Sequence, residues 1–258
     1  MTTTERLAGR TALVTGGSRG IGRSISGRLA RDGALVAVHY GHDHEAAQRA
    51  VKEIETAGGR AFAVHAELGV HGDAAALWQE FDARLADRGE EPGLDILVNN
   101  AGISVPGTVA DVTEENFDRL VAVNARAPFF LVQHALGRLR DGGRIVNVSS
   151  AATRTAFPQI TAYNMSKGAL DTLTPDLAKQ LGPRGITVNT VAPGFTDTGI
   201  NPTLADPQVR QAYAAASVFG RVGTPDDIAD AVAFLASDDA RWVTGQWLNA
   251  SGGVVLGP

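Results

Sequence analysis

The sequence predicts a doubly wound α/β fold, in which a seven-stranded parallel sheet carries helices on both faces. Short apolar runs alternate with longer amphipathic segments from end to end, which is the pattern of repeated β-α units. A glycine-rich stretch lies directly between the first apolar run and the first amphipathic segment. No change in composition divides the 258 residues, of which 44% are hydrophobic, so we expect one domain over residues 1–258.

Seven short aliphatic runs are interpreted as strands, because parallel strands buried on both faces are apolar along their length. They cover residues 11–15, 35–39, 61–66, 96–99, 145–149, 187–191 and 246–249. The segments between them show helical periodicity and provide the crossovers that parallel strands require. These helices are expected at residues 20–31, 45–57, 72–86, 114–139, 162–181 and 226–236.

Glycine and proline punctuate this pattern. The pairs Gly58-Gly59 and Gly142-Gly143, and the stretch 182–185, are expected to end helices, since glycine adopts left-handed backbone angles without a Cβ penalty. Pro175 removes one helical hydrogen bond, so we expect a kink or a break in the helix at 162–181.

The periodicity fails between residues 194 and 223. This stretch contains Pro202, Pro207 and scattered apolar residues. A long irregular segment inside a compact domain is often a lid or a binding loop. We therefore expect it to be a substrate loop.

The glycine-rich stretch indicates a nucleotide. Residues 15–22 read TGGSRGIG, and Gly16, Gly20 and Gly22 permit a tight turn with close backbone approach to a pyrophosphate. The start of the following helix supplies N–H groups and a positive dipole. The position of the stretch between strand and helix predicts the dinucleotide-binding turn of a Rossmann fold.

The end of the second predicted strand indicates which dinucleotide binds. An acidic residue there would hold the ribose 2′-hydroxyl of NAD, but the chain has Tyr40. Arg19 and His42 are expected near the same corner and suit a phosphate dianion, which favours NADP in its reduced form, NADPH. In the alternative interpretation, Arg19 is a solvated surface residue and Asp43 binds the ribose.

A tyrosine and a lysine are spaced for proton transfer. Tyr163 and Lys167 share one face of a predicted helix. An ammonium beside a phenol lowers the pKa of the phenol, which suits alcohol–carbonyl interconversion. Ser150, after the fifth predicted strand, lies at the edge where open α/β sheets bind ligands, and its hydroxyl suits a carbonyl oxygen.

Together with three asparagines, these features resemble the short-chain dehydrogenase/reductase family. Asn99 and Asn100 end the fourth predicted strand, whereas Asn124 lies in an apolar helical segment, where a satisfied core amide is the ordinary interpretation. The resemblance covers nearly the whole chain and is strongest to 3-oxoacyl-carrier-protein reductases and polyketide or naphthol ketoreductases. It rests on TGGSRGIG at 15–22, NNAG at 99–102, Asn124, Ser150, YNMSK at 163–167 and Pro193-Gly194.

The resemblance implies a catalytic tetrad. Tyr163 would protonate the substrate oxygen, and Lys167 would lower the pKa of that phenol and bind the nicotinamide ribose. Ser150 would orient the carbonyl, and Asn124 would hold a water linked to Lys167. Cofactor contacts are implied for Gly16, Ser18, Arg19, Gly20, Ile21, Gly22, Tyr40, His42, Asn100, Ala101, Gly102, Tyr163, Lys167, Pro193, Gly194, Thr196 and Thr198.

One departure from the family concerns the adenine. Where relatives commonly have aspartate and an aliphatic residue, the chain has Glu67 and Leu68, with an acid one methylene longer. Both are retained as expected cofactor contacts. Substrate contacts are expected from Ser150, Phe157, Tyr163 and Phe195, the phenylalanines being part of an apolar pocket.

Composition argues against several other functions. The chain has no cysteine, which removes disulfides, thiolate metal sites and cysteine nucleophiles. A net charge of -5 lacks the basic footprint of a nucleic-acid-binding protein. No run approaches the roughly 20 apolar residues that span a bilayer, and the N-terminus lacks the apolar middle of a signal peptide, so a cytoplasmic protein is expected. The six histidines show no zinc-binding spacing, and no metal is expected.

The leading hypothesis is an NADPH-dependent ketoreductase that transfers hydride to a 3-oxoacyl, polyketide or aryl ketone, with Tyr163 as general acid. The substrate would be a small molecule, either free or carrier-bound, and the resemblance implies a homotetramer built on the two long helices. Two alternatives stay open. One is an NAD-dependent alcohol, sugar or steroid dehydrogenase, and the other is a nucleotide-sensing protein without catalysis.

Overall fold

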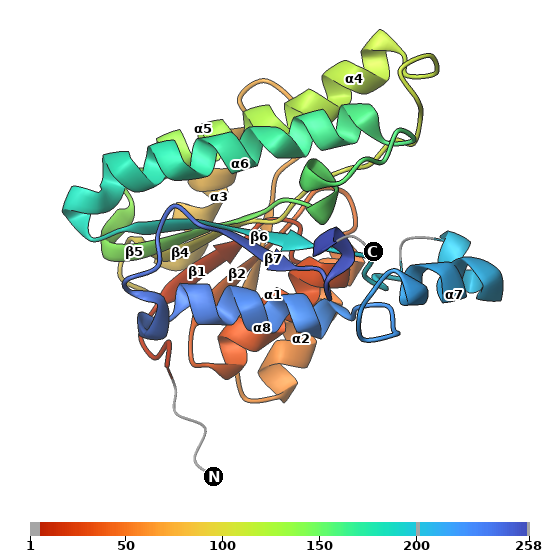
Figure 1. The fold of residues 1–258 in the computed structure, drawn as a ribbon. Helices are drawn as coiled ribbons and strands as arrows, with labels where there is room; N and C mark the ends of the chain where they lie inside the picture. Colours follow the sequence, from red (N-terminus) through yellow and green to blue (C-terminus); the bar gives the residue numbers. More distant parts are fainter. Residues whose placement is uncertain (1–5, 200–201, 257–258) are drawn as a thin grey trace.

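The core of the molecule is a sheet of seven parallel strands in the order β3-β2-β1-β4-β5-β6-β7 (Figure 1). The computed structural model describes residues 6–199 and 202–256. The strand order reverses between β1 and β4, the point at which open sheets of this kind bind ligands. The doubly wound fold and all seven predicted strands are confirmed. The strands are β1 Thr11–Val14, β2 Leu35–Tyr40, β3 Arg60–His65, β4 Leu94–Asn99, β5 Leu139–Val148, β6 Thr187–Pro193 and β7 Trp247–Ala250.

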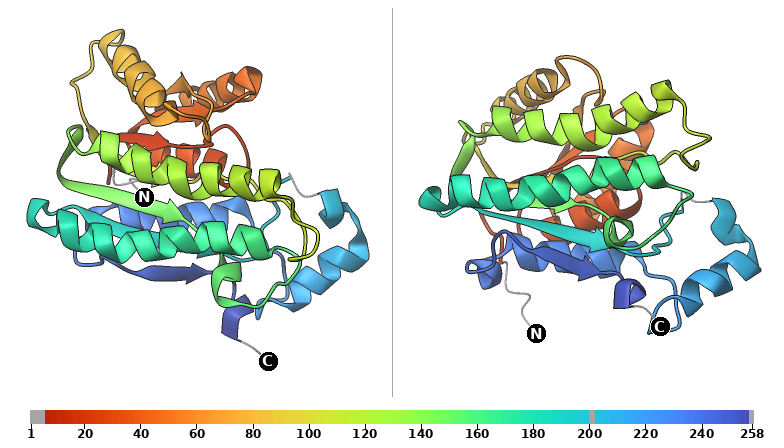
Figure 2. Two further views of the ribbon diagram at one scale, coloured as in Figure 1. Left: turned by 90° about the horizontal axis from the view of Figure 1, so that it is seen from above. Right: turned by 45° about the horizontal axis from the view of Figure 1, so that its top comes forward.

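Helices cover both faces of the sheet (Figures 1 and 2). One face carries α1, α2 and α8, and the other carries α3, α4, α5 and α6. Each layer has its own apolar core: Ile25 of α1 packs with the first, and Trp78 of α3 with the second. The helices are α1 Gly20–Arg31, α2 His44–Thr56, α3 Asp73–Ala86, α4 Glu114–Val121, α5 Ala127–Ala135, α6 Thr161–Leu181, α7 Pro207–Ala215 and α8 Pro225–Ala236.

Strand β5 is longer than the sequence predicts. It begins at Leu139, so Gly142 and Gly143 lie inside a strand and not at the end of a helix. A Cβ on Gly143 would lie 2.9 Å from the carbonyl oxygen of Arg140, close to where the register between β4 and β5 shifts. The helix-end prediction is wrong here because glycine within a strand also marks an irregularity in the pairing.

The segment 114–139 is not one α-helix. Helix α4 ends at Val121, a π-helical turn covers Ala122–Arg126, and α5 ends at Ala135. Turns of this type inside helices often mark functional sites, and this one carries Asn124. The prediction of a single helix is therefore wrong in its middle and in its last turn.

Helix α6 runs without interruption across Pro175. Pro175 is exposed, so water can reach the carbonyl that loses its helical partner. The predicted break is wrong, and the predicted kink stays a prediction.

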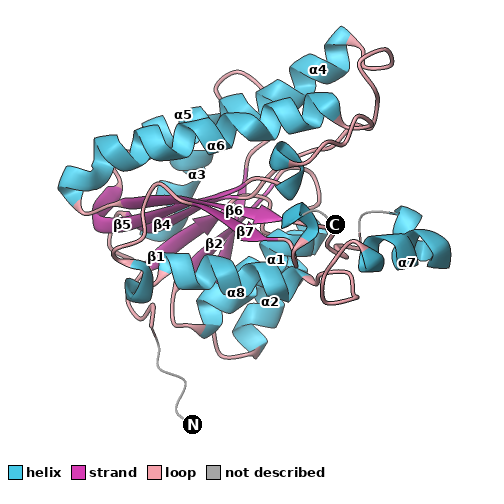
Figure 3. Ribbon diagram, in the orientation of Figure 1, coloured by secondary structure: helices cyan, strands magenta, loops and turns pink. Residues whose placement is uncertain are grey.

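The segment 194–223 is less irregular than expected. It contains a 3₁₀ turn, Pro202–Ala205, and helix α7, which projects from the body of the molecule (Figure 3). Asp206 caps α7 by accepting a hydrogen bond from the backbone N–H of Gln208 (2.8 Å), and Pro207 follows in the first turn. A capping aspartate followed by proline starts a helix, so the expectation of a wholly irregular loop is wrong. Residues 200 and 201 lie outside the described residues.

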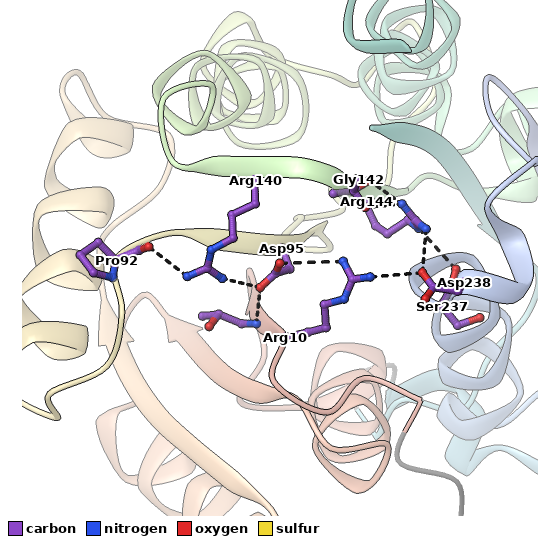
Figure 4. Close-up of polar contacts among 10 residues, drawn as sticks. Arg10, Pro92, Asp95, Arg140, Gly142, Arg144, Ser237 and Asp238 are labelled. Atoms are coloured by element: carbon purple, nitrogen blue, oxygen red, sulfur yellow. Dashed lines mark hydrogen bonds and ion pairs between the residues drawn. The ribbon is translucent and has the colours of Figure 1, made fainter. Parts of the chain in front are cut away.

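A row of charged side chains joins the amino ends of the central strands, at the edge opposite to the glycine-rich turn (Figure 4). Asp95 of β4 is buried and accepts hydrogen bonds from the backbone N–H of Thr11 (2.8 Å) and from Nη1 of Arg140 (2.6 Å). This row holds the starts of β1, β4 and β5 together. Its ion pairs run through Arg140, Asp95, Arg10, Asp238 and Arg144.

Candidate active site

The glycine-rich turn joins β1 to α1 at the carboxyl edge of the sheet. A Cβ on Gly22 would lie 2.1 Å from the carbonyl oxygen of Gly16, and one on Gly17 would lie 2.8 Å from Oγ of Ser26. Gly16 and Gly20 have φ angles of 62° and 53°, which favour glycine. The first turn of α1 therefore passes directly over the backbone of Gly16 and forms a cradle at the helix N-terminus, a shape that suits a pyrophosphate.

Thr15 and Asn100 fasten this turn to the end of β4. The Thr15 hydroxyl accepts hydrogen bonds from the backbone N–H groups of Asn100 and Ala101 (2.9 Å each). The Asn100 side chain donates to the carbonyl oxygens of Thr15 (2.8 Å) and Gly16 (3.2 Å). Asn100 and Ala101 thus lie against the turn.

A buried histidine lies beneath the turn. Nδ1 of His39 accepts a hydrogen bond from the N–H of Gly16 (3.0 Å), and Nε2 lies 2.9 Å from the carbonyl oxygen of Ala66. The carbonyl requires a proton on Nε2 and the N–H requires a bare Nδ1, so the two contacts define the neutral imidazole. Burial lowers the pKa of His39 to about 4.

This histidine makes folding sensitive to acid. Its pKa is about 4 in the folded chain, against 6.5 for an imidazole exposed to water, so between these pH values the unfolded chain binds a proton that the folded chain does not. The free energy of unfolding is expected to fall by about 3 kcal/mol from this group as the pH drops from about 7 to about 4. Urea unfolding of the wild type and of His39→Asn across this pH range measures the fall in the free energy of unfolding. The variant has no imidazole at position 39, so its free energy of unfolding should fall by less. An identical pH slope in both proteins contradicts the expectation.

Tyr40, at the end of β2, stands where an acidic residue would hold the ribose of NAD. Its hydroxyl shares a hydrogen bond with Nδ1 of His44 (2.7 Å), and its ring centroid lies 5.1 Å from that of His65. Arg19 is exposed at the N-terminus of α1, and His42 is exposed after β2. A phenol and imidazoles thus lie together at this corner, and an exposed guanidinium lies at the start of α1.

The acidic residues nearby are placed differently. The Asp43 carboxylate accepts a hydrogen bond from the N–H of Ala46 (2.8 Å) and caps α2. Glu67 is exposed after β3, and Leu68 packs partly against the core beside α3. The Asp43 carboxylate is thus occupied in capping α2, whereas the alternative interpretation needs it to bind the ribose of NAD.

Tyr163 and Lys167 lie one turn apart on α6, at the end of β5. The Tyr163 phenol forms a hydrogen bond with Ser150, and Nζ of the buried Lys167 donates to the carbonyl oxygen of Val148 (2.8 Å). Burial lowers the pKa of Lys167 to about 8. The sequence predicts a lowered pKa for the phenol, but burial raises the pKa of Tyr163 and outweighs the Ser150 hydrogen bond, which acts in the other direction. The phenol is therefore protonated at neutral pH.

Asn124 points from the π-helical turn toward the same place. Its fully buried amide exchanges two hydrogen bonds with the backbone of Ile103 and donates a third to Oγ of Ser166 (2.9 Å each). A Cβ on Gly102 would lie 3.0 Å from Nζ of Lys167 and 3.2 Å from Oδ1 of Asn124. Glycine therefore keeps the space in front of the ammonium open.

Helix α6 is fixed on the sheet by a row of buried polar groups. Nδ2 of Asn99 donates to Oδ1 of Asn147, and Nδ2 of Asn147 donates to Oγ1 of Thr174 (2.9 Å each). The Thr174 hydroxyl donates to the carbonyl oxygen of Leu170 (2.8 Å). These bonds connect β4, β5 and α6, so they set the position of the helix that carries the phenol and the ammonium.

The segment after β6 leaves from the same edge. Pro193 ends the strand, and a Cβ on Gly194 would lie 2.7 Å from the carbonyl oxygen of Ser251. The Thr196 hydroxyl donates to the carbonyl oxygen of Gly194 (3.1 Å), and Thr198 is partly buried. The close approach explains why glycine stands at position 194.

Three aromatic rings gather where this segment folds back. The ring centroid of Phe195 lies 5.8 Å from that of Phe157, edge to face, and 4.0 Å from that of Tyr213, nearly parallel at 14°. These rings come from the segment before α6, the segment after β6 and helix α7. We call this group the aromatic cluster.

Sequence reasoning missed three residues that shape the site, Thr15, Gly17 and His39. A signal existed for His39, since a single polar residue within an apolar strand normally has a buried partner. Thr15 and Gly17 belong to the stretch TGGSRGIG, in which the sequence predicted roles for other residues, among them the glycines at 16, 20 and 22. Among the described residues, no helix has the length and apolar character to cross a membrane, and no cluster of acidic and histidine side chains is arranged to hold a metal ion.

Several known proteins are similar to this chain over nearly its full length. Residues 16–255 match a family model described as enoyl-(acyl carrier protein) reductase. The angucycline C-6 ketoreductase LanV with bound NADP is 54% identical, with a TM-score of 0.94 and 98% of each chain covered, and LanV is also known with NADP and rabelomycin. A short-chain dehydrogenase/reductase from Serratia marcescens is 40% identical, with a TM-score of 0.89 over 97% of this chain and 99% of that one. Versicolorin reductase stcU of Emericella nidulans is 41% identical over 96% of both chains.

The Rossmann sheet, the glycine cradle and the tyrosine–lysine pair define a nucleotide-dependent oxidoreductase. With these relatives, the chain belongs to the short-chain dehydrogenase/reductase family.

Proposed function

We propose that the protein is an NADPH-dependent ketoreductase that reduces a ketone of a polycyclic aromatic polyketide. The observation that carries the proposal is the convergence of three features at one sheet edge. These are the glycine cradle, the Tyr163 phenol bonded to Ser150, and the aromatic cluster. The ketoreductase LanV, which is known with rabelomycin, supports the aromatic substrate class.

The residues present fit NADPH. A cradle at Gly16 and Gly22 that any Cβ would fill suits the pyrophosphate, and the open space at Gly102 suits the ribose next to Lys167. Arg19 and the polar side chains around Tyr40 suit the 2′-phosphate. The other cofactor contacts inferred from the sequence are proposed unchanged.

When bound, NADPH supplies the hydride for the carbonyl carbon. We infer that the Ser150 hydroxyl hydrogen-bonds the carbonyl oxygen and orients it, and that Tyr163 donates its proton to that oxygen as negative charge develops. The pKa of Tyr163 is raised by burial, so the phenol is protonated at neutral pH and carries the proton that it donates. Lys167 then stabilises the phenolate by its positive charge, and Asn124 holds a water that returns the proton through Lys167.

Arg19→Ala is expected to weaken NADPH binding by about tenfold to a hundredfold and to leave NADH binding within about twofold, because only NADPH carries the 2′-phosphate. Fluorescence titration of both nucleotides measures the two Kd values. Arg23→Ala is the matched control, since Arg23 is exposed one turn further along α1 and pairs with Glu53 of α2. A wild type that prefers NADH, or a preference unchanged by Arg19→Ala, contradicts the NADP assignment.

A ketone panel tests the substrate class. β-Ketoacyl thioesters, aryl ketones and polycyclic quinones are offered with NADPH, and loss of NADPH absorbance is followed. Polycyclic aromatic ketones are expected to react with the highest kcat/KM. Faster reduction of the thioesters would instead favour a carrier-bound substrate, and oxidation of alcohols with NAD alone would favour the dehydrogenase alternative.

We further propose that the enzyme is a cytoplasmic homotetramer. Large apolar side chains are exposed on the long helices, Phe129 on α5 at 48% and Met165 on α6 at 60%. Association of copies of the chain through these helices would bury such side chains. Light scattering is expected to give four times the mass of the chain, and a monomer at micromolar concentration would contradict the proposal.

A further inference from the structure

His39 is a buried titratable side chain that the proposed reaction does not use. It lies at the last position but one of β2 and is 2% exposed. We propose that His39 is a positioning residue for the cofactor, which holds the glycine-rich turn in the shape that receives the pyrophosphate and ties it to the end of β3. This inference rests on the proposed function, since it takes the turn to be the NADPH site.

On the side of the turn, His39 engages two successive residues. The N–H of Gly16 donates to Nδ1 (3.0 Å), and the N–H of Gly17 donates to the His39 carbonyl oxygen (2.8 Å). Just before them, the N–H of Thr15 donates to the carbonyl oxygen of Val98 (3.0 Å). These three N–H groups are therefore bound to the sheet, whereas the first N–H groups of α1 have no acceptor within their own helix and are available to a phosphate.

On the other side, His39 reaches the segment proposed for the adenine. Its Nε2–H donates to the carbonyl oxygen of Ala66 (2.9 Å), and the N–H of Ala66 donates to the Tyr40 carbonyl oxygen (3.1 Å). Ala66 directly precedes Glu67 and Leu68, two proposed adenine contacts. One imidazole thus links the two segments that would hold the two ends of the adenosine diphosphate part of the cofactor.

The turn needs a restraint of this kind. Glycine has more backbone freedom than any other residue, and the turn contains Gly16, Gly17, Gly20 and Gly22. An aliphatic side chain at position 39 would match the rest of β2, but it would leave the Gly16 N–H without its acceptor. A buried N–H without a partner is unfavourable, so the turn would shift or fluctuate.

Three substitutions separate the two contacts of the ring. His39→Leu fills much of the same volume and makes neither side-chain hydrogen bond. His39→Asn places a carbonyl oxygen near the position of Nδ1, so it retains the bond to Gly16. His39→Gln places an amide N–H near the position of Nε2, so it retains only the bond to Ala66. Leu85→Ala, in the core of α3, is the control that lowers stability without touching the turn.

Amide hydrogen exchange of the protein without nucleotide measures the turn directly. In His39→Leu, exchange of the peptide covering residues 15–22 is expected to be about tenfold faster, and in His39→Asn it stays near the wild-type rate. The Kd for NADPH is expected to rise about tenfold in His39→Leu, while kcat at saturating NADPH stays within about twofold. Leu85→Ala is expected to leave both the turn peptide and the Kd unchanged.

Unchanged exchange at residues 15–22 together with an unchanged Kd in His39→Leu would overturn the proposal, because a residue that only fills space gives that result. Equal defects in His39→Asn and His39→Leu would overturn it as well. If His39→Leu does not fold, His39→Gln replaces it, with the same loosened turn expected. If the wild type binds no NADPH, the proposed function fails, while the exchange rates still decide whether His39 holds the turn.

Discussion

Tyr163→Phe is expected to lower kcat for ketone reduction by about 10³-fold, because it deletes the proton donor and keeps the ring. The Kd for NADPH should stay within about twofold, since the phenyl ring fills the same partly buried space on α6. Steady-state kinetics and nucleotide titration measure the two quantities on one preparation. The split between a lost kcat and a retained Kd distinguishes a missing proton from a damaged site.

Thr172→Val is the control for this experiment. It removes an exposed hydroxyl from the same helix, away from the phenol, and is expected to leave kcat unchanged. Reduction of the ketone by Tyr163→Phe at the wild-type rate would show that the phenol is not the proton donor.

Asp95→Ala is expected to lower the free energy of unfolding by about 3 kcal/mol. Asp95 is 6% exposed and has three partners: the backbone N–H of Thr11, the guanidinium of Arg140 at 2.6 Å, and that of Arg10 at 3.8 Å. Its removal leaves a buried N–H without an acceptor and two arginines without their shared carboxylate. Urea unfolding measures the loss.

Two further substitutions identify the source of that loss. Asp95→Asn keeps an acceptor for the Thr11 N–H and removes the charge, so a smaller loss of about 1–2 kcal/mol is expected. Asp141→Ala breaks the ion pair between Asp141 and Arg184. Because the Asp141 side chain is 78% exposed, this substitution is expected to lower the free energy of unfolding by less than about 1 kcal/mol. If Asp95→Ala proves as mild as Asp141→Ala, the row of charges does not hold the strand starts together.

The row of charges and the candidate site thus lie at opposite edges of the sheet. The amino edge is joined by Asp95 and its arginines, whereas the carboxyl edge carries the glycine cradle and the Tyr163 phenol. Because the two edges share strands β1, β4 and β5 but not side chains, Asp95→Ala is expected to affect stability far more than kcat, and Tyr163→Phe to affect kcat far more than stability.

Periodicity predicted the fold well because the central strands β1, β4 and β6 are buried along their whole length, and β2 at all but its last residue. Runs such as 35–39 and 96–99 have no ordinary explanation other than central parallel strands. The glycines at 16, 20 and 22 could likewise be predicted, because so tight a turn requires glycine. A Cβ on Gly22 would lie 2.1 Å from the carbonyl oxygen of Gly16.

Local rules failed where one residue type has two uses. Glycine at 142 and 143 serves a strand irregularity as well as it would serve a helix end, and Pro207 starts a helix although proline also breaks them. The π-helical turn at Asn124 has no periodic signature, because one additional residue per turn is invisible against a 3.6-residue pattern.

Some contacts of the candidate site could not be predicted from the sequence, for a different reason. The bond from His39 to Gly16 joins positions 23 residues apart, and the chain from Asn99 through Asn147 to Thr174 joins three elements. Such contacts depend on the packed arrangement of the strands. The direction of the Tyr163 pKa also depends on burial, which spacing along a helix does not specify.

The most direct test of the central claim is the transfer of deuterium to a polycyclic aromatic ketone from NADPH that carries deuterium at both positions of the nicotinamide C4. The account predicts one alcohol formed per NADPH consumed, with the deuterium on the carbinol carbon and with almost none formed by Tyr163→Phe. Deuterium on a former alkene carbon, or NADPH that binds but transfers no deuterium to any ketone of the panel, would contradict it.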